Sequence, residues 1–224
     1  MTSASWPEAY PGSASASAFG VPGSPDALRH VMGHFASGVT IGTALHRGIK
    51  HAMTATAVCA VSLDPPLVLV CVSKSSRFHR AITETDNWCL SLLTVDQEQI
   101  AWHFSNRGRD LLSQFDDISH TPSPLSGTPL IDDALAWVEC TMYGMHDGGD
   151  HTIVVGEIVR ASGLPSDDDP NARPPLTYYR GAYSLGRERI GEESETPGAT
   201  ASVGERGCAH ADHINEVQPE VAVL

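Results

Sequence analysis

The sequence HAMTATAVCAVSLDPPLVLVCVSKSSR, from His51 to Arg77, determines the fold of this chain. It begins with a strand-like run of short side chains: Thr54, Ala55, Thr56 and Ala57. It passes through the turn residues SLDPP to a second strand, 67–72, in which every residue is apolar. It ends in hydroxyls and cations: Ser73, Lys74, Ser75, Ser76 and Arg77. Short side chains leave the backbone open to a planar ring, and the terminal cluster suits the phosphate of its tail.

The elements around this stretch predict a mainly β chain. A helix is expected from Pro25, with Ser24 as its cap, an apolar face that includes Leu28 and Phe35, and an end at Gly38. Two more helices are expected at about 76–86 and from Thr94, whose partner Gln97 completes a capping box. Strands are expected at 39–46, 50–63, 67–73, 88–94, 135–144, 151–161 and 176–184, with loops at 116–134 and 162–175. Many short strands with few helices favour a β-barrel over a doubly wound sheet.

Composition divides the 224 residues into three parts. Residues 1–24 are rich in Ser, Ala, Gly and Pro and lack the pattern of a signal peptide, so a disordered lead-in is expected. Residues 187–224 have eight acids against three arginines and predict a flexible acidic tail. Residues 25–186 remain as one domain, long enough for a sizeable core.

Several classes of protein are disfavoured. A net charge of −13 argues against nucleic-acid binding, and no apolar run reaches the ~20 residues that a membrane helix needs. The five cysteines are widely spaced, and four lie in strand-like runs where cysteine usually packs as a small buried hydrophobe, which favours a reduced, cytoplasmic setting. Because strand 67–72 must be covered on both faces, by core and helices or by a partner subunit, we expect a homodimer.

Three further segments contain candidate binding residues. HFSNRGRDLLSQF includes Phe104 and Ser105, although Phe104 also fits a helix core. HDGGDHTIVVGEI, 146–158, brings His151 to a strand after a turn, and its Asp and Gly residues fit that turn better than a metal site. PPLTYYRGAYSLG, 174–186, offers flat rings and a guanidinium, and would also fit an aromatic edge strand. No Walker or G-x-G-x-x-G motif follows a strand.

These segments, in this order over about 27–186, resemble the flavin reductases that serve two-component monooxygenases, members of the FMN-binding split-barrel family. The resemblance implies a six-stranded Greek-key split β-barrel with flanking helices and a homodimer. It also implies direct hydride transfer from NAD(P)H to flavin without a catalytic side chain. Reduced flavin would pass to a separate flavin-dependent monooxygenase or halogenase.

The resemblance also implies a role for each matching residue. The flavin ring would lie at Thr54, Ala55, Thr56 and Ala57, its phosphate at the 73–77 cluster, and its tail at Phe104 and Ser105. The nicotinamide dinucleotide would meet His151 of the G-D-H motif together with Tyr179, Arg180, Gly181 and Tyr183. The cluster favours FAD over FMN, and the lack of a further basic group favours NADH over NADPH.

Three alternatives stay open from the sequence. An oxidase of the pyridoxamine-phosphate type would share the barrel and hold FMN tightly, but would lack the G-D-H and Y-R-G strings. A non-enzymatic flavin-binding or redox-sensing module would bind flavin without turnover. A metal or haem protein would differ in its visible spectrum.

Overall fold

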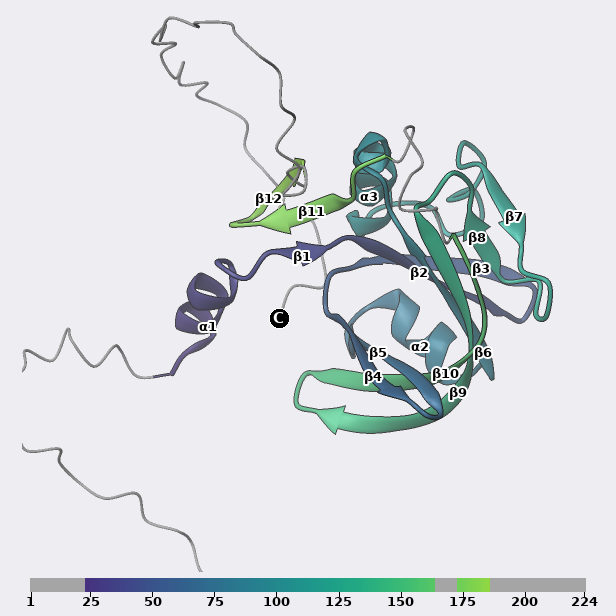
Figure 1. Cartoon of the computed structure of the whole chain (residues 1–224), viewed down its shortest axis with the longest axis horizontal. Helices are drawn as coiled ribbons and strands as arrows, with labels where there is room; N and C mark the ends of the chain where they lie inside the picture. The colour runs from purple at the N-terminus through teal and green to yellow at the C-terminus, as the bar shows by residue number, and fades with distance from the viewer. Residues whose placement is uncertain (1–22, 164–172, 186–224) are drawn as a thin grey trace, which may run out of the picture.

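The computed structural model describes residues 23–163 and 173–185 and is mainly β (Figure 1). In chain order the elements are α1 (Pro25–Met32), β1 (Ser37–Gly38), β2 (Thr40–His46), β3 (Ile49–Ala55), β4 (Val58–Leu63), β5 (Pro66–Ser73), α2 (Arg77–Thr83), β6 (Asn87–Leu92), η2 (Val95–Gln97), α3 (Glu98–Ser105), β7 (His120–Pro122), β8 (Pro129–Ile131), β9 (Ala136–Gly148), β10 (His151–Ser162), β11 (Leu176–Tyr179) and β12 (Ala182–Leu185).

The main sheet has seven strands in the order β3-β2-β6-β9-β10-β5-β4, and it curls around α2 (Figure 1). All of its pairings are antiparallel. Its two edge strands, β3 and β4, follow each other in the chain. The prediction of one strand over 50–63 was therefore wrong, which accounts for seven strands where six were expected. The Val58 N–H donates to the Thr56 carbonyl at 3.0 Å, a tight turn that ends β3.

Two hydrophobic clusters make up the core. In the first, Phe78, Ala81 and Ile82 of α2 pack against the inner face of the main sheet. In the second, Ala101 and Phe104 of α3 are buried with residues from β2, β3 and β11. The sheet is close-packed at Gly156, where an added Cβ would lie 2.5 Å from Cζ2 of Trp88. Both helices are thus fixed by tertiary packing, which positions the loops that follow them.

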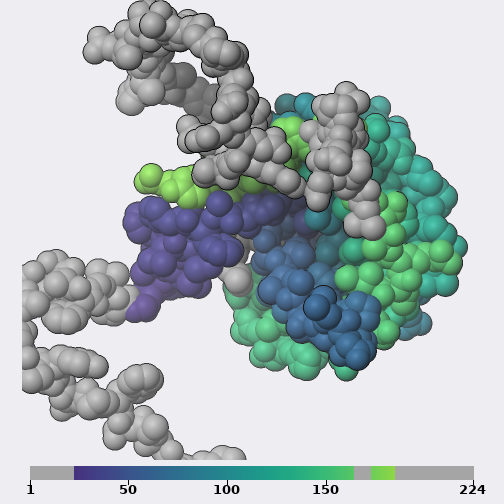
Figure 2. All heavy atoms as spheres, in the orientation of Figure 1, coloured from purple at the N-terminus to yellow at the C-terminus, as the bar shows by residue number. Residues whose placement is uncertain are grey.

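Helix α1 and a small three-stranded sheet, β1-β11-β12, together form what we call the arm, residues 25–38 and 176–185. Figure 2 shows the arm, purple and yellow-green, projecting from one side of the molecule. The expected strand 176–184 is in fact a hairpin that turns at Arg180 and Gly181, whose φ angles are 50° and 83°. Two successive positive φ values match the right-handed twist of a two-residue hairpin loop. The Arg180 N–H donates to the Gly33 carbonyl at 2.8 Å and joins this turn to the end of α1.

Helix α1 begins as predicted, with the Ser24 side chain accepting from the Ala27 N–H at 3.1 Å. It ends at Met32 rather than near Gly38, because Gly33 caps it and the chain then extends into β1. In the described structure none of its residues is buried: Val31 on its apolar side is 65% exposed, and Phe35, which follows the helix, is 69% exposed. The stripe therefore does not pack on the core of this chain.

Several other predictions have clear outcomes. Gln97 accepts the Thr94 N–H at 3.1 Å, as the capping box requires. The expected loop 116–134 contains the short strands β7 and β8. Cys89 and Cys140 are buried as expected, but Cys59 is exposed because β4 is an edge strand.

The lead-in 1–24 and the tail 187–224 fall almost wholly outside the described residues. No helix among the described residues is long and apolar enough to span a bilayer. Within the same residues, no group of His, Cys, Asp and Glu has the arrangement of a metal site.

Candidate functional site

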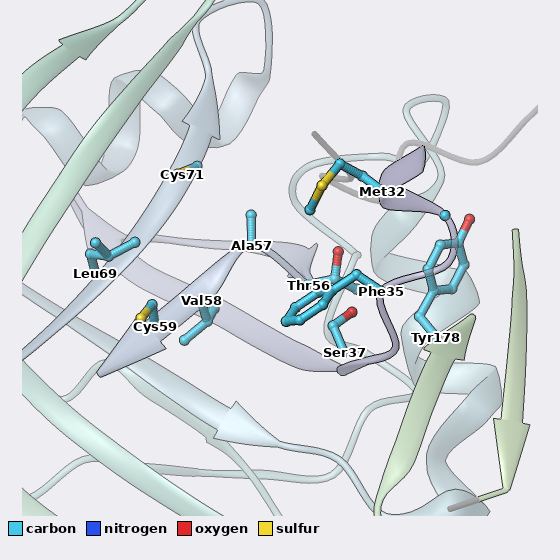
Figure 3. Close-up of a pocket in the computed structure, with 11 residues that line it drawn as sticks. Met32, Phe35, Ser37, Thr56, Ala57, Val58, Cys59, Leu69, Cys71 and Tyr178 are labelled. Carbon is cyan, nitrogen blue, oxygen red and sulfur yellow. The ribbon is translucent and has the colours of Figure 1, made fainter. Parts of the chain in front are cut away.

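A cavity of about 220 Å³ opens between the arm and the broken edge of the main sheet (Figure 3). We call it the ring cavity. One wall belongs to the arm and the other to the β3–β4 link, β4 and β5. Its lining is almost entirely apolar or small: Met32, Gly33, Phe35, Ser37, Thr56, Ala57, Val58, Cys59, Leu69, Cys71 and Tyr178. Figure 3 shows the Phe35 ring extending from the arm toward the sheet wall, with Tyr178 on the arm side of the cavity.

The sheet wall is flat because of strand alternation. Leu69 and Cys71 alternate along β5 and share one face, and Cys59 is the cross-strand partner of Leu69. The Cys71 N–H donates to the Ala57 carbonyl at 3.0 Å, which extends this pairing to the β3–β4 link. Strand β5 is therefore apolar on both faces, with Val70 and Val72 in the core and Leu69 and Cys71 in the cavity.

Only half of the predicted ring segment reaches this cavity. Thr56 and Ala57 line it, whereas Thr54 and Ala55 are fully buried. The Thr54 hydroxyl donates to the Ala101 carbonyl of α3 at 2.7 Å. The Ala55 carbonyl accepts from the Thr40 hydroxyl at 2.9 Å. Thr54 and Ala55 thus anchor the end of β3 to the core, and Thr56 and Ala57 are the partly exposed residues that line the ring cavity.

A second, smaller cavity of about 70 Å³ lies at the other end of the same segment. Three arginines and two serines give it positive charge and hydrogen-bond donors beside four apolar residues, and we call it the cationic corner. Its lining is Ala52, Met53, Ser75, Ser76, Arg77, Phe78, Phe104, Arg107 and Arg109. The structure therefore brings Ser75, Ser76 and Arg77, predicted to bind the phosphate, together with Phe104, predicted to contact the flavin tail.

Arg109 is held rigidly at the cationic corner. Its guanidinium donates to Gln114 Oε1 at 2.9 Å, to the Asn106 carbonyl at 2.5 Å, and to the Ala52 carbonyl of β3. Its charge also lies 5.5 Å from the centre of the Phe104 ring. A guanidinium held in this way needs little further ordering to meet an anion.

The environment of the corner lowers the pKa of the neighbouring His51. Burial lowers the pKa of His51, and His46, Arg77 and Arg109 lower it further. His51 is therefore favoured as the neutral imidazole, and arginines carry the positive charge of the corner. Burial and Lys74 likewise lower the pKa of His79, whose Nε2 lies 2.8 Å from the Thr152 hydroxyl.

Lys74 and Ser73 lie apart from the lining of the corner. Lys74 Nζ bonds the Asp147 carboxylate and, at 2.5 Å, the Gly149 carbonyl in the β9–β10 turn. This bond and the lysine charge hold the pKa of Asp147 below its usual range. Ser73 Oγ bonds Ser75 Oγ at 2.9 Å. The predicted cluster is thus divided: Ser75 to Arg77 face the cavity, and Lys74 fastens the hairpin.

His151 opens β10 directly opposite Ser73 of β5. Because Ser73 follows Leu69 and Cys71 in the strand alternation, His151 lies on the same sheet face as the ring cavity. Its side chain is 13% exposed, and its Nδ1 bonds Asp150 Oδ1 at 2.8 Å. That hydrogen bond, followed by the charge of the histidine, lowers the pKa of Asp150.

The Y-R-G-x-Y segment is divided between turn and core. Arg180 and Gly181 form the hairpin turn, and Tyr179 is 41% exposed, with its ring edge-on to His34. The Tyr183 ring packs against Trp102 and Tyr178 at 5.2 and 5.5 Å. Burial raises the pKa of Tyr183. Ser105, predicted to contact the flavin tail, is buried and donates to the Trp102 carbonyl at 2.9 Å.

Sequence reasoning missed several lining residues. Arg107 and Arg109 stand just after the quoted Phe104-Ser105 step, and two cations around a glycine were a signal that could have been used. Met32, Phe35 and Tyr178 were out of reach, because they enter the ring cavity only through the placement of the arm.

Comparisons with known proteins show the family of this chain. Residues 32–186 match the family model described as flavin reductase-like domain. The reductase subunit HsaB of a flavin-dependent monooxygenase from Mycobacterium tuberculosis is 36% identical over 161 residues, covering 71% of this chain and 81% of HsaB. This chain is therefore similar to a reductase component over most of both lengths.

Solved structures give the same answer. BorF, the flavin reductase component of a bacterial two-component tryptophan halogenase, superposes with a TM-score of 0.67 at 35% identity, covering 74% of this chain and all (100%) of BorF. The Streptomyces globisporus NADH:FAD oxidoreductase SgcE6, in complex with NAD and FAD fragments, gives 0.65 at 34% identity, covering 76% and 94%. The chain belongs to the flavin reductase-like family.

Proposed function

We propose that this protein is an NADH:flavin oxidoreductase that supplies reduced flavin to a separate flavin-dependent monooxygenase or halogenase. The observation that carries the proposal is the placement of two unlike cavities along one segment, 52–59. The apolar ring cavity suits a planar heterocycle, and the cationic corner suits the phosphate of its tail. The family and the relatives described above use this chemistry.

The residues bind and orient rather than react. Thr56, Ala57 and the Leu69–Cys71 face support the ring, and Ser75, Ser76 and Arg77 donate to the phosphate. A bound flavin accepts a hydride from the nicotinamide, so no side chain is needed as nucleophile or acid–base pair. The apolar walls exclude water from the two rings and hold them in reactive contact.

The nicotinamide dinucleotide is assigned to the open side of the ring cavity. His151 supports this assignment because it shares the sheet face of Leu69 and Cys71. Tyr179, Arg180, Gly181 and Tyr183 belong to the arm, whose Tyr178 lines the cavity. NADH is the assigned donor and FAD the assigned acceptor, with FMN as a second acceptor.

The assembly is assigned as a homodimer of Greek-key split barrels. Exposed apolar side chains on β4, β9 and β10 support it: Val61, Leu63, Tyr143, Met145 and Val159 are 41–94% exposed. Apolar side chains exposed together on one sheet are typical of an interface. Sedimentation of the purified protein tests the assignment, and a monomer at micromolar concentration contradicts it.

The activity itself is tested by the loss of dihydronicotinamide absorbance when NADH is mixed with protein and either FAD, FMN or no flavin. The expected result is turnover that requires added flavin. A tightly bound FMN that copurifies and turns over without added flavin favours the oxidase alternative. Flavin binding without NADH oxidation favours the redox-sensing module.

A further inference from the structure

A third cavity, larger than the other two at about 770 Å³, runs along the outer side of α3. We call it the α3 cavity. Neither the ring nor the phosphate assigned above occupies it. It meets the cationic corner at Arg107, which lines both spaces. A ligand whose phosphate lies in the corner would reach the α3 cavity by passing this arginine.

The walls of the α3 cavity combine one flat aromatic side chain with polar groups. Trp102 is 38% exposed, although its ring packs edge-on against Tyr183 at 5.2 Å. Its Nε1 donates to Glu98 Oε1 at 3.2 Å, which fixes the indole plane. Gln99 contributes an amide from the start of α3 and Asn106 contributes one from its end, and Asp117 contributes a carboxylate from the facing loop.

We propose that the α3 cavity binds the adenylate half of FAD. The inference rests on the proposed function, because it needs the flavin phosphate in the cationic corner. Adenine would stack on the Trp102 indole, the diphosphate would pass Arg107, and a ribose hydroxyl would donate to Asp117. FMN ends at its phosphate and leaves this cavity empty. The cavity therefore selects FAD over FMN.

NADH also contains an adenylate, but the position of the cavity favours FAD as its source. Arg107 connects the α3 cavity to the corner assigned to the flavin phosphate. None of the residues assigned to NADH (His151, Tyr179, Arg180, Gly181 and Tyr183) is in the lining of the α3 cavity as described. Tyr183 contacts the cavity only from behind, where its ring packs edge-on against Trp102. The two sources are separated by using matched pairs of ligands, FAD with FMN and NADH with reduced nicotinamide mononucleotide.

The test measures the dissociation constants of FAD and FMN by quenching of flavin fluorescence, for the wild type and Trp102→Ala. Base stacking contributes ~1–3 kcal/mol, so Trp102→Ala should weaken FAD by roughly tenfold and change FMN by less than about twofold. Trp102→Phe keeps a stacking face and should retain most of the FAD affinity. Leu112→Ala, a control at a side chain 78% exposed outside the three assigned spaces, should change neither.

A second variant guards against misfolding of Trp102→Ala. Asp117→Asn changes an exposed loop residue and should weaken FAD by several-fold while FMN is unaffected. Equal losses for FAD and FMN, or no loss of FAD, in a folded variant would overturn the proposal. A rise confined to the KM for NADH, absent with reduced nicotinamide mononucleotide, would also overturn it by assigning the cavity to NADH. Wild-type turnover of FMN by NADH, measured in parallel, shows whether the proposed function itself has failed.

Discussion

The ring cavity and the cationic corner share one segment of chain but are built on different principles. Residues 56–59 face an apolar space closed by the arm, and residues 52–53 face a positively charged space closed by two loops. The ring cavity offers shape and small side chains, with few groups that could bond a ligand. The corner offers charge, in arginines that are already positioned by the chain.

This difference implies a division of labour. Apolar contact is proportional to buried area and hardly depends on salt, whereas charge-assisted bonds to phosphate are stronger and are screened by salt. The ring cavity should therefore control whether hydride transfer occurs, and the corner should control how tightly flavin is held.

The largest expected effect comes from filling the ring cavity. Ala57→Phe places an aromatic ring on the sheet wall where the flavin ring is assigned. We expect flavin reduction to fall at least about a hundredfold, since misplacing reacting groups by about an ångström has effects of that size. Steady-state NADH oxidation with FAD and FMN measures it. Ala60→Phe, at an exposed position of β4 outside the cavity lining, is the control, and equal losses in both variants would break the assignment.

The next effect separates the two cations that the sequence had grouped together. Arg77 lines the corner, whereas Lys74 is paired with Asp147. Arg77→Ala should raise the KM for FMN roughly ten- to a hundredfold, because a bond to a charged group contributes ~1.5–3 kcal/mol. Lys74→Ala should have a much smaller effect on KM. A larger effect from Lys74→Ala than from Arg77→Ala would show that the corner is wrongly placed.

A third prediction concerns the open side of the ring cavity. His151→Ala should raise the KM for NADH several-fold, roughly 1 kcal/mol for a lost hydrogen bond, and leave the KM for flavin unchanged. His146→Ala, at an exposed site on the neighbouring strand β9, serves as the control. Parallel shifts in both constants, or in neither, would remove His151 from the dinucleotide site.

The smallest effect is on stability against pH. Burial and nearby cations lower the pKa of His51, so the unfolded chain binds its proton more readily than the folded chain. The free energy of unfolding should therefore fall as pH falls from about 7.5 to about 5.5, through the ordinary histidine pKa of about 6.5. Urea denaturation of wild type and His51→Gln measures this, and the variant should lose less stability over the same range. An identical slope in both proteins would show that His51 is not the group responsible.

The cationic corner and the ring cavity also differ in how much of each could be predicted from the sequence. The corner was predictable, because Ser75, Ser76 and Arg77 are adjacent in the chain and a strand-to-helix junction keeps such residues together. The ring cavity was not, because its arm wall approaches the sheet only through pairing of Ser37–Gly38 with Thr177–Tyr178, about 140 residues later.

Two local errors have simple physical causes. Asp147, the partner of Lys74, is 73 residues away in sequence, so no local pattern could reveal that Lys74 is paired with a carboxylate. The break at Thr56–Ala57 was hidden because small and β-branched residues fit a continuous strand equally well. By contrast, the turn at Arg180–Gly181 had a visible signal, a glycine beside residues that favour strands.

The most direct test of the account removes the phosphate from the ligand and the guanidinium from the protein in one cycle. Rates of reduction by NADH are measured for FMN and riboflavin, with wild type and Arg77→Ala. Wild type should have a lower KM for FMN than for riboflavin, and Arg77→Ala should largely lose this difference. The rates at saturating flavin should be similar for all four pairs of protein and flavin. A preference for FMN retained in full by Arg77→Ala, or a saturated rate that collapses with riboflavin, would contradict the account.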